Sequence, residues 1–227
     1  MVLRVARGDP ATTGGRQQQA GDSVADWREY GEVELDPVLA AAAGAFVETG
    51  YHGATVRDIA RRAGLSVPGM YHHFATKQDM LVGLLDVTMD DLLWRSQAAR
   101  HEGAGDPVRA FSLLIECLVL YHCHRRDLAF IGASEMRSLE PDNRTRIVRL
   151  RTTQQRMVDA EVDAAVEAGS FRVSHAHDAS RAVTTMCVAI PQWYRPGHSS
   201  SPEEVARRYV GFALGLMGYD GPALTRR

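Results

Sequence analysis

Lysine is almost absent from this chain of 227 residues, since Lys77 stands alone among 26 Lys and Arg residues. The excess of arginine is typical of a GC-rich genome, so arginine abundance by itself indicates no function. The formal net charge of −2 excludes a surface that is basic throughout. Any contact with nucleic acid must therefore be confined to a local basic patch.

Cysteine and long apolar runs are also scarce. Cys117, Cys123 and Cys187 are odd in number and show no CxxC spacing, which predicts reduced, buried thiols in place of a disulfide framework. No apolar run reaches the roughly 18 residues of a membrane span. The basic opening MVLRVARGDP is not followed by the apolar stretch of a secretory signal. We therefore expect a cytoplasmic protein with no membrane partner.

Motifs of common enzyme classes are missing as well. The sequence has no GxSxG, HExxH, Walker loop or GxGxxG, and no carboxylate pair suited to acid–base catalysis. His122, Cys123 and His124 resemble a metal cluster, but positions i and i+2 point to nearly opposite sides of a helix. We therefore expect no catalytic residue, no metal site and no cofactor.

What the sequence does contain is helical periodicity. Residues 1–35 lack any period and are polar, which predicts a disordered arm. Every later element has the pattern of a helix, and capping residues such as Asp36, Thr55 and Ser66 mark the starts. About nine helices are expected, in an all-α fold, over 37–49, 56–63, 67–74, 77–100, 107–123, 128–139, 141–168, 177–194 and 203–219.

The segment from Phe46 to Leu81 carries the strongest functional signal. Two short helices separated by Ala63, Gly64 and Leu65 are typical of a helix-turn-helix, in which glycine permits the sharp turn. The second helix begins with exposed positions that can enter a DNA major groove.

The run TVRDIARRAGLSVPGMYHHFATKQDML, with Phe46 and Gly50 before it, resembles the TetR family of one-component repressors. The resemblance implies a homodimer that binds double-stranded operator DNA. It assigns DNA binding to residues 36–80, and ligand binding and dimerisation to residues 81–227.

The resemblance also implies roles within the motif. Thr55 and Ser66 open their helices, and the start of the Thr55 helix faces a phosphate. Arg57 is long enough to reach a guanine edge. Val67, Pro68 and Gly69 are of low polarity and face the bases. Tyr71 and His72 contact the DNA backbone or thymine methyl groups. His73 and Lys77 contact the DNA backbone.

Structural alternatives stand beside these roles. Met70 and Phe74 are expected in the core. Arg61 and Arg62 either neutralise phosphates or form a solvated helix face. His72 and His73 either contact DNA or only cap the helix end.

The second half resembles actinobacterial members of the family that are linked to fatty acyl or steroid metabolism. Two segments carry this resemblance, one around RSLEPDNR and one around QWYRPG. It implies a largely apolar effector, with an acyl-CoA thioester as the leading class. Apolar residues of the central helices are candidates for the effector pocket, although each of these residues could instead simply pack the helical bundle. They are Leu113, Cys117, Leu120, Tyr121, Ile131, Met136, Met157, Met186 and Trp193. Arg137, Arg144 and Arg151 could meet CoA phosphates or form a solvated face.

Apolar stripes on the last two helices predict the dimer interface. Their residues are Ala182, Val183, Met186, Ile190, Val205, Tyr209, Phe212, Ala213 and Leu216. Two other functions stay open beside a ligand-responsive repressor: an architectural DNA-binding protein without an inducer, and an enzyme built on a helical bundle.

Overall fold

A computed structural model describes residues 26–197 and 200–222, and within these ranges every regular element is a helix. The expected all-α fold is confirmed. In chain order the elements are α1 (Pro37–Gly53), α2 (Val56–Arg62), α3 (Val67–Tyr71), α4 (Lys77–Glu102), α5 (Pro107–His124), α6 (Arg126–Ser134), the 3-10 helix η1 (Glu135–Ser138), α7 (Pro141–Glu167), α8 (Ala176–Val188), α9 (Ile190–Trp193) and α10 (Pro202–Leu216).

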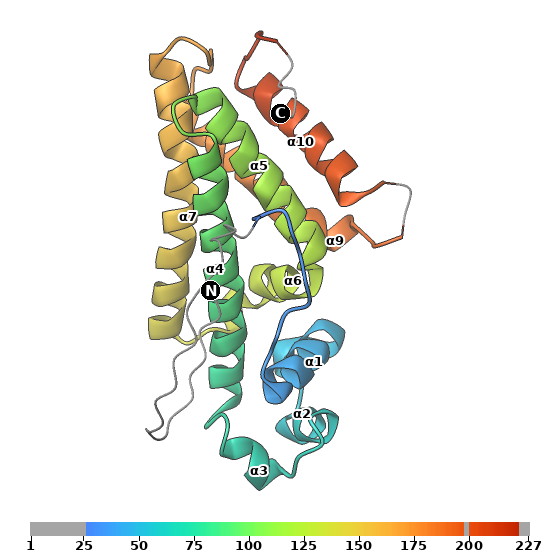
Figure 1. The fold of residues 1–227 in the computed structure, drawn as a ribbon. Coiled ribbons are helices and arrows are strands. Elements are labelled where there is room, and N and C mark those ends of the chain that lie inside the picture. The colour runs from blue at the N-terminus through green and yellow to red at the C-terminus, as the bar shows by residue number, and fades with distance from the viewer. Residues whose placement is uncertain (1–25, 198–199, 223–227) are drawn as a thin grey trace, which may run out of the picture.

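The helices form a small unit at one end and a long body (Figure 1). Helix α1 packs on α4, and α2 packs on α1 and on α3. Helix α4 then continues through the body beside α5 and α7. Helix α10 lies along α5 on the other side of the body. Helix α6 joins the two parts because it packs against both α1 and α4.

Two hydrophobic cores correspond to these parts. One lies around α1 to α3, the start of α4 and one face of α6, and the other lies among α4, α5, α7, α8 and α10. Phe46 and Met70 are fully buried in the first core, as expected for Met70, and Phe74 packs against it while partly exposed. Apolar burial of this kind supplies the main stabilisation of both parts.

The predicted helix starts are mostly confirmed. Asp36, Thr55, Ser66, Thr76, Asp106 and Ser201 each accept a backbone N–H of their helix through the side chain. The helix predicted over 128–139, directly after Asp127, begins at Arg126 instead and has no side-chain cap. Gly50, with φ of 70°, ends the regular part of α1 at the predicted place.

Four predicted helices are shorter or broken. The third ends at Tyr71, and the last ends at Leu216. The segment 128–139 changes from α to 3-10 geometry at Glu135. The segment 177–194 divides into α8 and α9 around Ala189, because Pro191 has no N–H to continue the helical hydrogen bonds.

The N-terminal segment 26–35, which we call the strap, corrects the expectation of a disordered arm. Residues 1–25 of that prediction lie outside the described residues. The strap packs on α4 and α5 and then leads directly into α1 (Figure 1). Trp27 is only 3% exposed and belongs to the core of the body, and its indole N–H donates to Glu102.

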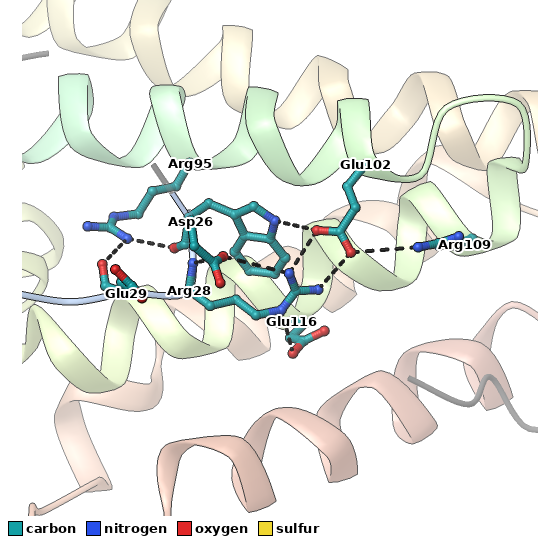
Figure 2. A network of polar contacts seen from close by, with 8 residues as sticks. Asp26, Arg28, Glu29, Arg95, Glu102, Arg109 and Glu116 are labelled. Atoms are coloured by element: carbon teal, nitrogen blue, oxygen red, sulfur yellow. Dashed lines mark hydrogen bonds and ion pairs between the residues drawn. The ribbon is translucent and has the colours of Figure 1, made fainter. Parts of the chain in front are cut away.

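Polar contacts fix the backbone and the charged groups of the strap (Figure 2). Arg95 of α4 donates to the carbonyl oxygens of Trp27 and Glu29, at 2.6 and 2.9 Å. Arg28 forms ion pairs with Glu102 and Glu116. Charged side chains, main-chain carbonyl groups and the indole of Trp27 make these contacts. Such contacts leave no hydrophobic periodicity in the sequence, so the sequence could not predict that the strap is ordered.

Candidate nucleic-acid interface

Helices α2 and α3 form the predicted helix-turn-helix. Gly64 has φ of 69°, and the N–H of Leu65 donates to the carbonyl of Ala60 at 2.9 Å, which closes the turn. Ile59 and Ala60 of α2 are buried in the same core as Met70 of α3. The two helices are therefore held as one rigid reading unit.

Both helix starts are capped by the predicted hydroxyls. Thr55 Oγ1 accepts from the N–H of Asp58, and Ser66 Oγ accepts from the N–H of Gly69, each at 3.1 Å. Each hydroxyl still has its own hydrogen to donate. A Cβ at Gly69 would lie 3.1 Å from Ser66 Oγ, so this cap favours the absence of a side chain there.

The outer face of this unit carries most of the predicted DNA contacts. Pro68, Tyr71, His72 and His73 are exposed, while Val67 and Gly69 are partly buried. Arg57 is exposed and makes no hydrogen bond or ion pair with any residue of 26–197 or 200–222. A long, unpaired guanidinium on this face is free to reach a base edge.

Arg61 and Arg62 are engaged within the protein. Arg62 pairs with Asp58 on its own helix and with Glu48 of α1, at 2.7 and 2.6 Å, and Arg61 pairs with Asp58. The guanidinium of Arg62 lowers the pKa of the Glu48 carboxyl, and hydrogen bonds from Arg61 and Arg62 lower the pKa of Asp58. Arg62 therefore joins α2 to α1, a role that the sequence pattern did not distinguish.

Lys77 has an internal role that the sequence did not indicate. Its Nζ donates to the carbonyl oxygens of Tyr51 and Ala54, at 2.7 and 2.9 Å, and lies 4.4 Å from the centre of the Tyr51 ring. Burial lowers the pKa of this ammonium group. Lys77 thus holds the end of α1 to the start of α4, and one N–H remains for a phosphate.

The comparisons with known proteins identify the family. A model described as bacterial regulatory proteins, tetR family, matches residues 38–84, and one described as tetracyclin repressor-like, C-terminal domain, matches residues 104–217. The chain is 30% identical over 189 residues to the HTH-type transcriptional repressor KstR2 of Mycobacterium tuberculosis, covering 81% of this chain and 92% of that protein. The chain belongs to the TetR family. These relatives are transcriptional regulators, not enzymes.

Solved structures agree with this membership. The ketosteroid transcriptional regulator KstR2 of M. tuberculosis superposes with a TM-score of 0.74 at 27% identity, covering 82% of this chain and 96% of that one. PfmR of Thermus thermophilus gives a TM-score of 0.73 at 29% identity, covering 82% and 100%. AibR, solved with isovaleryl coenzyme A and operator DNA, shares the fold at 22% identity and a TM-score of 0.69, covering 77% and 95%. Among the described helices, none is long and apolar enough to cross a membrane.

Apart from Trp193, the pocket candidates are divided between the two hydrophobic cores. Most belong to the core of the body, whereas Ile131 and Met136 belong to the core around α1. Trp193 is 50% exposed, because the short helix α9 places it on the surface, and its place in a pocket stays a prediction. An open cleft of about 510 Å³ at the far end of α4 includes Met157 but no other candidate. The remaining pocket residues stay predictions.

The dimer candidates fall into two sets. Val183, Ile190, Val205 and Ala213 are fully buried within the protomer, so the prediction that they contact a partner is wrong. Their apolar character serves the protomer core. Ala182, Met186, Tyr209, Phe212 and Leu216 are partly or fully exposed and stay predictions.

The cysteines and neighbouring histidines are not arranged as a metal site. All three cysteines are free and buried, as predicted. The ring of His122 contacts the Leu118 carbonyl inside the body, while His124 stacks on Tyr30 of the strap. Within the part of the chain that the structure describes, no three His, Cys, Asp or Glu residues are placed to hold a metal ion.

Proposed function

We propose that this chain is a ligand-responsive repressor that binds a palindromic operator as a homodimer in the cytoplasm. A largely apolar small molecule releases it from the DNA, and an acyl-CoA thioester is the leading class of effector. The single observation that carries the proposal is the exposed face of α2 and α3, where Arg57 pairs with no residue that the structure describes. An unpaired guanidinium beside a helix that fits the major groove suits operator recognition.

An exposed apolar surface supports the homodimer. We call Val188, Trp193, Tyr209, Phe212 and Leu216 the α8–α10 surface, because it spans α8, α9 and α10. Trp193 stacks on Tyr209 with ring centroids 6.3 Å apart, and Phe212 is 60% exposed. Large apolar patches on a protein surface mark interaction sites. A palindromic operator requires a twofold protein, and a self-complementary patch generates one.

Two observations support the effector class. The relative KstR2 is described as a ketosteroid regulator, and an apolar effector suits a body with an apolar core. Arg137 and Arg144 are exposed, and neither makes an ion pair with a described residue, so both remain candidates for the CoA phosphates. Arg151 is partly buried and its guanidinium donates to the Gly132 carbonyl, so fewer of its donors remain for a phosphate.

Gel-shift titration of the purified protein against its own promoter region tests the proposal. We expect specific binding that weakens steeply with salt, because Arg57 and other local cations displace counterions from phosphates. Acyl-CoA or steroid-CoA esters should release the DNA at the concentrations that raise the melting temperature. Affinity equal to that for random DNA would contradict the repressor. Specific binding that no metabolite changes would favour an architectural protein.

A further inference from the structure

Gln78, the second residue of α4, is buried where helices α1 to α3, which we call the reading head, meet the body. Its side chain is only 6% exposed. Its Nε2 donates to the carbonyl oxygen of Ser138 at 3.2 Å, and its Oε1 accepts the N–H of Glu140 at 3.1 Å. Since a carbonyl only accepts and an N–H only donates, these partners fix which way the amide points. Both ends of the amide are thus used by main-chain groups on either side of Leu139.

The segment 138–140, which we call the bracket, contacts the reading head and leads directly into the body. Leu139 is 7% exposed and lies in the core around α1. Ser138 Oγ lies 3.4 Å from Nε2 of His52 in the last turn of α1. Glu140 is the N-cap residue of α7. The bracket is therefore the place where the start of α7 meets both α1 and the first turn of α4.

Helix α7 belongs to the body along its whole length (Figure 1). Near its start Arg146 pairs with Asp86 of α4, and near its end Glu161 pairs with Arg100 of α4, each at 2.6 Å. Between these ion pairs the helix contributes buried apolar residues to the core of the body. The position of the bracket is therefore set by the body, and Gln78 ties the reading head to that position.

A second contact between the reading head and the body is apolar. Leu128 and Ile131 of α6 are buried in the core around α1. Hydrophobic contact is non-directional, whereas a hydrogen bond weakens steeply when its donor and acceptor turn out of line. The two hydrogen bonds of the Gln78 amide therefore define the angle of the reading head more sharply than the contact with α6 does.

We propose that Gln78 is a positioning residue that sets the half-site spacing of the operator, because it fixes the angle of the reading head on the body. In a dimer on a palindrome, the distance between the two α3 helices must match the distance between the half-sites. Each inserted base pair moves one half-site by about 3.4 Å and turns it by about a tenth of a helical turn. The inference rests on the proposed function, because only a dimer has two reading heads to space.

Operators with one or two base pairs added to or removed from the spacer test the inference on the full-length protein. A reading head that turns to meet a displaced half-site must break the two Gln78 hydrogen bonds. The wild-type protein should therefore lose about tenfold in affinity when the best spacing changes by one base pair. Gln78→Leu should reduce this difference to about twofold. Affinity for an isolated half-site should be unchanged, since the variant alters no residue of the DNA-reading face.

Changes to the bracket test the same hydrogen bonds from the other side. Glu140→Pro removes the N–H that Gln78 accepts, and the φ of −60° at Glu140 suits proline. Leu139 before it is extended, as a residue before proline should be. This variant should flatten the spacing profile in part, and it serves in place of Gln78→Leu if that variant does not fold.

Two matched controls should keep the wild-type profile. Glu140→Ala removes the same side chain as Glu140→Pro but keeps the N–H. Gln97→Leu makes the same change as Gln78→Leu at an exposed position of α4.

A wild-type spacing preference that survives in both Gln78→Leu and Glu140→Pro would overturn the inference and leave the repressor intact. Equal binding of every spacing by the wild-type protein would do the same. If the wild-type protein does not prefer a palindrome to a single half-site, the homodimeric repressor fails and the inference falls with it.

Discussion

Three basic side chains near the DNA-reading unit are held in three different ways. Arg57 pairs with no described residue, Arg62 is paired with Glu48 and Asp58, and Lys77 binds two carbonyl oxygens at the end of α1. Positive charge alone therefore does not make a residue of this unit a DNA contact. What matters is how many donors each side chain has left for phosphate or base.

Arg57→Ala should cost roughly 1–3 kcal/mol of operator affinity, mainly at one base pair of each half-site. The reason is that a guanidinium makes bidentate contact with a guanine edge. Arg57→Lys is the matched control, since it keeps the charge but loses that geometry. Binding to a panel of operator variants measures the effect. A uniform loss over the whole panel would show that Arg57 contacts only the backbone.

Lys77→Ala should lower the free energy of unfolding by about 1–3 kcal/mol, because two carbonyl oxygens lose a charged donor. It should also weaken binding to all DNA sequences alike and reduce the salt slope by about one unit, if the remaining N–H meets a phosphate. Urea unfolding and salt-dependent gel shifts measure the two effects separately. Unchanged stability would contradict the internal role of Lys77.

Helix starts with a capping side chain were predictable from the sequence, whereas the strap, which is held by tertiary contacts, was not. Thr55, Ser66 and Thr76 fix helix starts locally, so their residue types suffice. The strap has no such local signal. Its order depends on Arg95 and Glu102, which lie far along the chain. The break before α9 was predictable in principle from Pro191, but the apolar period across it concealed the break.

Trp27→Ala tests whether the strap is part of the folded unit. Deleting a buried indole should lower the free energy of unfolding by about 3–5 kcal/mol, through lost apolar contact and the cavity left behind. Trp94→Ala is the matched control, because Trp94 is exposed on α4 and its loss should cost little. Urea unfolding of both variants measures this. Equal, small effects would show that the strap contributes little to stability.

In the folded protein, apolar residues at helical spacing either fill the protomer core or form an exposed surface, and the sequence alone cannot separate these two roles. The stripes on α8 and α10 looked alike, yet Val183 and Ala213 fill the protomer core whereas Phe212 and Leu216 lie outside. Both purposes require the same residue types at helical spacing. For the same reason, the helix-turn-helix of α2 and α3 was predictable from a local motif, while the pocket candidates were divided between two cores.

Phe212→Glu should separate the protomers, because it places a charge in the middle of the α8–α10 surface, where burial without a partner is unfavourable. Since Phe212 is 60% exposed in the protomer, the fold itself should be little affected. Val148→Glu is the matched control, as Val148 is 45% exposed on α7, outside that surface. Sedimentation velocity should show a monomer for Phe212→Glu and a dimer for the control.

Affinity for a palindromic operator should fall by about a hundredfold, because each half-site is then bound separately and the gain from linking the two is lost. Binding to a single half-site should be unchanged, and a dimer that persists in Phe212→Glu would place the interface elsewhere.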